Sequence, residues 1–214
     1  MAEVQLRRHL ALVGLMGSGK TTVGRKLAAR LGRPFIDADE ALAVTTGRTV
    51  RQWFDDSGEA AFRAKEVDVL AQLLASDDPS VIATGGGIVC TEAGRALLNG
   101  PDVTVVWLRA SPAFVANRVA QKANKDHRPL LDADPRVVLD RHAAERNHLY
   151  AEVADLVVDV DPVHRDVDKP KKKLAEMVFE AFSQIDAEKA ARDRAQLARA
   201  AADAPATAPG GSQP

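Results

Sequence analysis

Eight residues near the N-terminus, Gly14–Thr21, have the types and the spacing of a phosphate-binding loop. They read G-L-M-G-S-G-K-T and match G-x-x-x-x-G-K-[ST], with an apolar run before them and a helical pattern after them. The backbone N–H groups of such a loop surround phosphate oxygens, and the following helix adds the positive end of its dipole. The motif therefore predicts that a nucleoside triphosphate is bound here. An accidental tight turn between a strand and a helix is the alternative.

Two residues of this motif have side chains suited to the triphosphate itself. The Lys20 ammonium group can reach the β- and γ-phosphates, and the Thr21 hydroxyl can bind Mg²⁺. A loop of this kind says nothing about where the phosphoryl group goes. The acceptor has to be inferred from other parts of the chain.

Two carboxylates, Asp37 and Asp39, follow the apolar run that ends at residue 36. Alternate side chains of an extended chain share a face, so both are expected to point the same way at the carboxyl end of a strand. Open α/β sheets bind ligands at that end. One carboxylate there can hold a metal ion's water shell, and the other can orient or deprotonate a hydroxyl group. A solvated turn with Asp39 as a helix N-cap explains the pair equally well.

Arginines are the second feature suited to an acidic acceptor. Arg63 and Glu66 lie one helical turn apart and can form an ion pair that fixes the direction of the guanidinium group. Arg146 lies in a later helical stretch, in the segment R-N-H-L-Y. For each arginine the alternative is an ordinary place on a charged helix surface.

Three consecutive glycines, Gly85–Gly87, follow the apolar run 81–83 and Thr84. Without side chains the backbone can approach a small ligand closely, although a flexible turn would use the same residues. Many triphosphate-binding proteins have an acidic residue at this place for Mg²⁺, and this chain has none. Asp37 is therefore the better candidate for the acid beside the metal.

Further along, the basic stretch 122–131, K-A-N-K-D-H-R-P-L-L, is typical of a loop that folds over phosphates, with Arg128 as the residue that supplies the positive charge.

The elements that must position these residues follow from the hydrophobic pattern. Short apolar runs alternate with longer helical patterns, which predicts an α/β fold around a parallel sheet. The expected strands are 9–15, 34–37, 81–84, 103–108 and 156–160. The expected helices are 21–31, 50–74, 92–98, 112–122 and 135–153, and a last one beginning at Pro170. Leu174, Val178, Phe182 and Ile185 give this last helix one apolar stripe that can close the domain.

Length and composition predict one compact domain with short extensions. The 214 residues suffice for a single domain of ordinary size, and the 46% of hydrophobic residues suffice for its core. We expect an N-terminal tail over 1–7 and the domain over 8–186, with a substrate-binding region at about 37–66 and a lid at about 119–134. After about residue 187 large apolar residues disappear, which favours a solvated helix that fades into disorder by 214.

Charge and cysteine usage exclude several classes of protein. A formal net charge of −1 gives no overall positive field for nucleic acid or anionic lipid. The single cysteine, Cys90, cannot form an intramolecular disulfide, which fits a reducing compartment. The spacing of His142 and His148 does not suit one helical face, and no second ligand cluster supports a zinc site. Because neither a signal peptide nor an apolar run of membrane-spanning length is present, we expect a soluble cytoplasmic protein. We also expect a monomer.

Taken in order, G-L-M-G-S-G-K-T, D-A-D, F-R-A-K-E, G-G-G, R-P-L-L and R-N-H-L-Y resemble the shikimate kinases from about residue 9 to about residue 161. The resemblance implies a P-loop NTPase-type three-layer sandwich whose five-stranded parallel sheet has the order 2-3-1-4-5. It also implies an enzyme that uses ATP and Mg²⁺ to convert shikimate into shikimate 3-phosphate. This reaction belongs to chorismate and aromatic amino acid biosynthesis.

The resemblance also assigns roles to individual residues. It implies that the metal site consists of Thr21 and Asp37 and that the shikimate contacts are Asp39, Arg63, Gly86 and Arg146. The residues that it implies in catalysis are Lys20, Asp39 and Arg128, the last as the lid arginine on the phosphates. The ATP site that it implies consists of Gly17, Ser18, Gly19, Lys20, Thr21, Thr22 and Arg128.

One departure and two alternatives stay open. In the family an arginine and a proline after the last strand help to hold the adenine, whereas this chain has Pro162 and Arg165 in altered order. The first alternative is a kinase for another carboxylated polyol, such as gluconate. The second is a nucleotide-dependent binding or switch protein that transfers no phosphoryl group to a metabolite.

Overall fold

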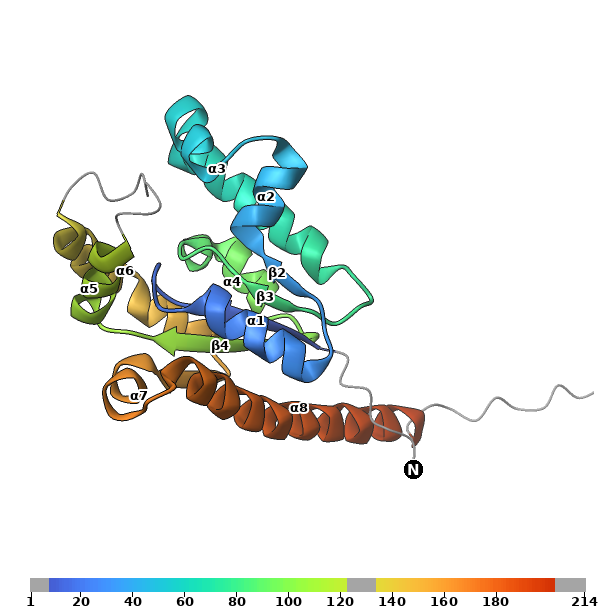
Figure 1. The fold of residues 1–214 in the computed structure, drawn as a ribbon. Helices are drawn as coiled ribbons and strands as arrows, with labels where there is room; N and C mark the ends of the chain where they lie inside the picture. The colour runs from blue at the N-terminus through green and yellow to red at the C-terminus, as the bar shows by residue number, and fades with distance from the viewer. Residues whose placement is uncertain (1–7, 123–133, 203–214) are drawn as a thin grey trace, which may run out of the picture.

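The computed structural model describes residues 8–122 and 134–202 of the 214-residue chain. The strands are β1 (His9–Val13), β2 (Phe35–Asp37), β3 (Val81–Ala83), β4 (Val103–Arg109) and β5 (Leu156–Asp159). The helices are α1 (Lys20–Leu31), α2 (Ala38–Thr46), α3 (Val50–Leu74), α4 (Glu92–Leu98), α5 (Pro112–Lys122), α6 (Pro135–Val153), α7 (Val160–Asp166) and α8 (Pro170–Ala202), with a 3₁₀ turn, η1 (Ile88–Cys90). Figure 1 shows their arrangement.

The five strands form one parallel sheet of order β2-β3-β1-β4-β5, which confirms the predicted fold class and strand order. Strand β1 lies at the centre, where Leu10 pairs with Val81 of β3 on one side and with Thr104 of β4 on the other. All five residues of β1 are buried. A strand buried on both faces needs helices on both, and the helical connections between parallel strands supply them.

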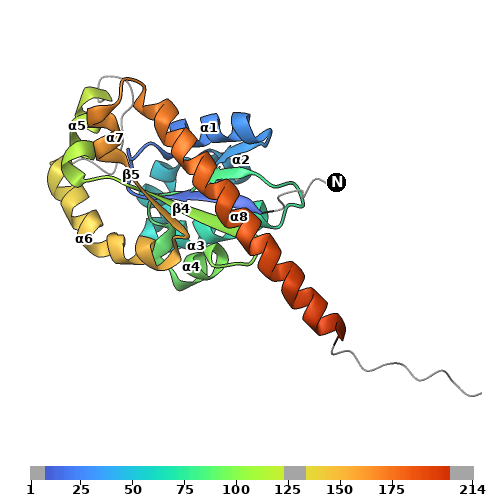
Figure 2. The same ribbon diagram turned by 90° about the horizontal axis from the view of Figure 1, so that it is seen from below.

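Alternate residues of β1 pack into two different cores. Leu10 and Leu12 pack with α1 and α8, where Val178 and Phe182 are fully buried. Ala11 and Val13 face the opposite core, which is built by α3, α4 and α6. Figures 1 and 2 show α1 and α8 together on one side of the sheet, and α3, α4 and α6 on the other side. The fold is therefore a three-layer sandwich, and α8 closes one of its outer layers as its apolar stripe predicts.

A smaller unit extends from the carboxyl end of the sheet. It consists of α2 and the first half of α3, and Figure 1 shows it above the strands. Its core is shared with the second half of α3, where Phe62 and Val69 form a cluster with Leu42 of α2, and Trp53 and Phe54 pack against this cluster. Gly58 divides α3, because its backbone (φ 77°, ψ 171°) is not helical. Only glycine adopts such a conformation at little cost, so Gly58 lets the first half of α3 turn away from the second.

Several element boundaries differ from the predicted ones. The helix over 38–46 was not predicted: the chain becomes helical directly after Asp37, whose side chain accepts a hydrogen bond from the Asp39 N–H group. The proposed N-cap, Asp39, is therefore wrong, and Asp37 is the N-cap. The sequence also gave no expectation of η1 or of α7, both of which are short. Among the described residues, no helix is both long enough and apolar enough to span a membrane.

The packing of α1 on the sheet makes a prediction about Gly24. A Cβ atom at this position would lie 2.5 Å from Phe35 Cε2 and 3.2 Å from Leu12 Cδ1. Overpacking of this kind costs about 1–3 kcal/mol, so we expect Gly24→Ala to lower the free energy of unfolding by that amount despite the higher helix propensity of alanine. Urea denaturation measures the change. The same substitution in a Phe35→Leu background should cost less, and equal costs in both backgrounds would show that Phe35 is not the obstacle.

Candidate active site

The phosphate-binding loop joins β1 to α1 and has the predicted glycine-dependent conformation. Gly14, Gly17 and Gly19 have φ angles of 135°, 78° and 112°. At Gly14 a Cβ atom would also lie 2.6 Å from the carbonyl oxygen of Leu108 at the end of β4. Side chains are therefore excluded from this turn both by backbone strain and by the neighbouring strand.

The start of α1 offers donors to an anion. The helix begins at Lys20, and its N-cap, Gly19, has no side chain that could accept hydrogen bonds from the first-turn N–H groups. The Lys20 ammonium group is buried against the loop and donates to the carbonyl oxygens of Gly14 (2.8 Å) and Leu15 (3.0 Å). Ser18 is fully buried, and within the described residues its hydroxyl has no hydrogen-bond partner. Uncapped amides beside a cation fit a polyphosphate.

Thr21 and Asp37 form a hydrogen-bonded pair whose oxygens could hold a divalent cation. The Thr21 hydroxyl donates a 2.9 Å hydrogen bond to Asp37 Oδ2. Both groups are partly buried at the end of the loop, where they present two hard oxygen ligands side by side. The described residues contain no cluster of three or more histidine, cysteine, aspartate or glutamate side chains suited to a metal ion. The two oxygens of Thr21 and Asp37 fit Mg²⁺, which takes few protein ligands and completes its shell with water and phosphate oxygens.

The two carboxylates after residue 36 do not point the same way, so the expectation of a shared face is wrong. It assumed that the chain stays extended, whereas α2 begins immediately after Asp37. The helical turn separates the side chains: Asp37 contacts Thr21, and Asp39 lines a separate pocket. The two carboxylates therefore lie in different parts of the site.

That pocket is a cavity of about 460 Å³ beside the loop. Met16 of the loop and Asp39 of α2 form one part of its wall, and the glycines after β3 form another. The longer walls come from the two helices α3 and α6, whose polar residues in the lining are Glu59, Arg63, Glu66, Arg141, His142, Glu145 and Arg146. A charged pocket next to a phosphate loop suits a small ionic acceptor.

The predicted ion pair between Arg63 and Glu66 is confirmed. Arg63 Nη1 donates to Glu66 Oε2 at 2.8 Å, and Glu59 binds the other edge of the guanidinium group at 3.0 Å. Glu66 is only 4% exposed, and burial raises the pKa of its carboxyl group while Arg63 opposes that change. Its second oxygen, Oε1, has no hydrogen-bond partner in the described part of the chain. The pair thus fixes Arg63 and leaves one buried acceptor.

The three glycines after β3 mark the place where the site residues meet. A Cβ atom at Gly85 would lie 2.0 Å from Glu66 Oε1 and 3.2 Å from Asp39 Oδ1. One at Gly87 would lie 2.2 Å from the central carbon of the Arg63 guanidinium group. Any larger residue here would displace the charged groups themselves.

The middle glycine, Gly86, contacts both the phosphate-binding loop and side chains of α6. A Cβ atom at Gly86 would lie 3.4 Å from the Gly14 carbonyl oxygen and 3.5 Å from the Met16 nitrogen, so this glycine contacts the loop. Its carbonyl oxygen accepts hydrogen bonds from Arg146 Nη1 (3.3 Å) and from the hydroxyl of Tyr150. Arg146 Nε is buried, and no described residue accepts a hydrogen bond from it. Arg63 and Arg146 therefore converge on one glycine run from opposite helices.

Two pocket residues were missed or misjudged in the sequence. His142, set aside as a metal ligand, is 8% exposed and lines the pocket. Burial and the nearby Arg146 lower the pKa of its imidazole to about 4. Cys90, considered in the sequence only for disulfide formation, is exposed at the same pocket. Their spacing gave no signal, because neither belongs to a recognisable motif.

A further cation, Arg118, lies near the phosphate-binding loop. Arg118 of α5 lies 3.8 Å from the position of a Cβ atom at Gly19, and its guanidinium group is 3.5 Å from the His164 imidazole. It was missed because an arginine on an amphipathic helix looks like a surface residue. The predicted lid arginine, Arg128, lies outside the described residues. Pro162 and Arg165 are exposed residues of α7.

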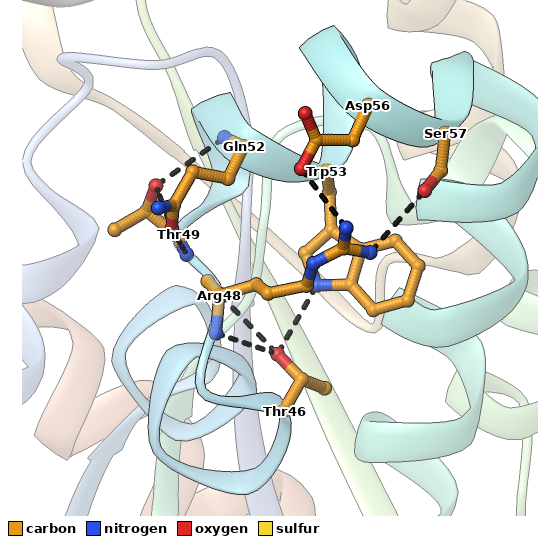
Figure 3. A network of polar contacts seen from close by, with 7 residues as sticks. All are labelled: Thr46, Arg48, Thr49, Gln52, Trp53, Asp56 and Ser57. Atoms are coloured by element: carbon orange, nitrogen blue, oxygen red, sulfur yellow. Dashed lines mark hydrogen bonds and ion pairs between the residues drawn. The ribbon is translucent and has the colours of Figure 1, made fainter.

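The first half of α3 is held by a polar network around Arg48, shown in Figure 3. The Arg48 guanidinium group donates to Asp56 Oδ2 (2.9 Å) and Ser57 Oγ (3.3 Å) and lies over the Trp53 ring. Trp53 Nε1 in turn donates to Thr46 Oγ1 at the end of α2. The network therefore ties the end of α2 to the segment 50–57, directly before Gly58 and the helix that carries Arg63.

Comparison with known proteins places these features in a family. The family model described as shikimate kinase matches residues 16–183. The shikimate kinase of Bradyrhizobium diazoefficiens is 39% identical over 195 residues, which cover 90% of this chain and 88% of that protein. The shikimate kinase of Halorhodospira halophila is 45% identical over 160 residues, or 74% of this chain and 88% of that protein.

A solved structure gives the same result in three dimensions. The shikimate kinase from Acinetobacter baumannii, in complex with shikimate, superposes with a TM-score of 0.73 at 32% sequence identity. The similarity covers 83% of this chain and 93% of that protein.

The Arg48 network makes a prediction about the segment before Gly58. Exposed ion pairs contribute about 1 kcal/mol or less to global stability, so Arg48→Ala should change the free energy of unfolding little. Amide hydrogen exchange in residues 50–57 should nevertheless become faster, because the contacts to Asp56, Ser57 and Trp53 are lost together. Arg51→Ala is the matched control, since Arg51 makes one exposed pair with Asp55 in the same segment. Equal exchange in the two variants would contradict the role given to Arg48.

Proposed function

The chain belongs to the shikimate kinase family, and from this premise we propose that its pocket binds shikimate while its loop binds ATP. The reaction transfers the γ-phosphoryl group of ATP to the 3-hydroxyl of shikimate and gives shikimate 3-phosphate and ADP. The single observation that carries the proposal is the convergence of Arg63 and Arg146 on the glycine run beside the phosphate loop. We expect a monomeric enzyme. We expect it to act in the cytoplasm, where ATP is available, as a step of aromatic amino acid biosynthesis.

On the donor side, backbone N–H groups of the loop and of the first turn of α1 bind the phosphates. Lys20 neutralises charge on the β- and γ-phosphates, and Arg128 contributes as the lid arginine. When Mg²⁺ is bound, it neutralises further phosphate charge, and Thr21 and Asp37 are the residues that would hold it. The uncapped start of α1 and the Thr21–Asp37 hydrogen bond support these assignments.

On the acceptor side, the two guanidinium groups bind the carboxylate of shikimate. Arginine suits this task because its planar fork matches a carboxylate. Gly86 lets the ring approach the loop, and Asp39 accepts a hydrogen bond from the reacting hydroxyl group. Because the transition state of phosphoryl transfer is loose, correct positioning of that hydroxyl matters more than early removal of its proton. Asp39 therefore orients the nucleophile and takes its proton late.

The direct test of the function is ADP release with a panel of acceptors. Shikimate should stimulate release strongly, whereas quinate, gluconate and nucleoside monophosphates should not, and EDTA should abolish the reaction. Mass spectrometry should detect one phosphoryl group on shikimate. Stimulation by gluconate alone would make the chain a different polyol kinase. ADP release without any phosphorylated acceptor would make it a nucleotide-dependent switch.

Replacing either arginine should impair acceptor binding selectively. A hydrogen bond to a charged group contributes about 1.5–3 kcal/mol, so Arg63→Met and Arg146→Met should each raise the KM for shikimate by roughly 10- to 100-fold. The KM for ATP should change less than about threefold, because the hydrogen bonds of the two side chains go to Glu59, Glu66 and Gly86 and not to the loop. Steady-state kinetics with each substrate varied in turn gives both values. An equal loss of ATP affinity in both variants would refute the assignment.

A further inference from the structure

We infer that His142 is a third binding residue for the carboxylate of the acceptor, to which its imidazole donates a hydrogen bond beside Arg63 and Arg146. The inference rests on the proposed function, because it deepens the description of the same pocket. It concerns a residue that none of the recognised motifs contains. Four observations support it: the position of His142 on α6, the charges around it, its free ring nitrogens and its neutral state.

The position of His142 brings it to the acceptor. It lies four residues before Arg146 on α6, so the two side chains share one face of the helix. Both line the pocket, and His142 is buried there with 8% of its surface exposed. His148, six residues later than His142, is exposed and does not line the pocket. Of these two histidines on one helix, the pocket therefore uses only one.

The charges around the ring identify which end of the acceptor it meets. Those that act most strongly on His142 are Arg146, Arg141 and Glu145 of α6 and Arg63 of α3. Asp39, which lies near Gly85 and is the proposed partner of the reacting hydroxyl group, is not among them. His142 therefore lies at the guanidinium end of the pocket, where the carboxylate of the acceptor binds.

The ring is available to a ligand. Among the described residues, neither ring nitrogen of His142 has a hydrogen-bond partner, and the residue lines the pocket. At neutral pH the imidazole is uncharged, because burial and Arg146 keep its pKa near 4. A neutral imidazole has one N–H donor and one acceptor nitrogen. It can therefore bind a carboxylate without adding a third positive charge beside Arg63 and Arg146.

The test compares four single variants of the full-length protein by isothermal titration calorimetry. His142→Leu removes the donor at similar size, and His142→Asn and His142→Gln return an N–H donor near one ring nitrogen or the other. His148→Leu makes the same chemical change on the exposed part of the same helix. Each protein is titrated with shikimate, with shikimate methyl ester and with ATP, and its melting temperature is recorded.

We expect His142→Leu to raise the Kd for shikimate about 10-fold or more, and one of the two amide variants to restore most of the affinity. His148→Leu and all values for ATP should stay within about twofold of the wild type. With the methyl ester, which lacks the charged carboxylate, wild type and His142→Leu should bind equally weakly. Equal melting temperatures would exclude loss of the fold as the cause.

Two results would overturn the inference. One is a Kd for shikimate that His142→Leu leaves unchanged, and the other is an equal loss of affinity for shikimate and for its methyl ester. Failure of the proposed function has a different signature, because the wild-type protein itself would then show no shikimate-dependent release of ADP. A wild type that phosphorylates shikimate, together with an unaffected His142→Leu, would refute the role of His142 alone.

Discussion

Both halves of the site depend on the glycine run Gly85–Gly87, where the backbone has no side chains. Glu66 and Asp39 come so close to Gly85, and Arg63 to Gly87, that even one methyl group on either glycine would displace a charged side chain. Gly86 contacts the phosphate loop and accepts a hydrogen bond from Arg146. A cleft that brings an anionic acceptor next to an anionic donor needs cations on several sides, and only backbone without side chains leaves room for them.

The topology of the sheet brings the glycine run to the other site residues. Because β1, β2 and β3 are parallel neighbours, the loop, Asp37 and the glycine run leave the sheet at the same edge. The helices α3 and α6 then bring Arg63 and Arg146 to that edge from parts of the chain that are distant in sequence. The Gly58 interruption and the Arg48 network position the first half of α3 over the acceptor pocket. The fold thus separates the donor half, on the loop, from the acceptor half, on helices.

Local patterns predicted much of this arrangement. The loop, the Arg63–Glu66 pair and the strand order follow from short-range spacing or from a family resemblance that rests on motifs. The different directions of the Asp37 and Asp39 side chains were not predicted. The prediction assumed the side-chain alternation of an extended strand, but the chain becomes helical directly after Asp37. His142 and Arg118 gave no signal, since helical spacing alone does not distinguish a pocket-lining side chain from one in solvent. Their roles depend on contacts between distant elements.

The central claim is that one cleft holds the triphosphate on the loop and an acidic ring between Arg63 and Arg146. A crystal structure of the protein with shikimate, Mg²⁺ and a non-hydrolysable ATP analogue tests it most directly. We predict that both guanidinium groups contact the shikimate carboxylate and that the 3-hydroxyl oxygen lies about 3–3.5 Å from the γ-phosphorus atom. A complex in which the carboxylate binds away from both arginines, or the 3-hydroxyl faces away from the loop, would contradict the account.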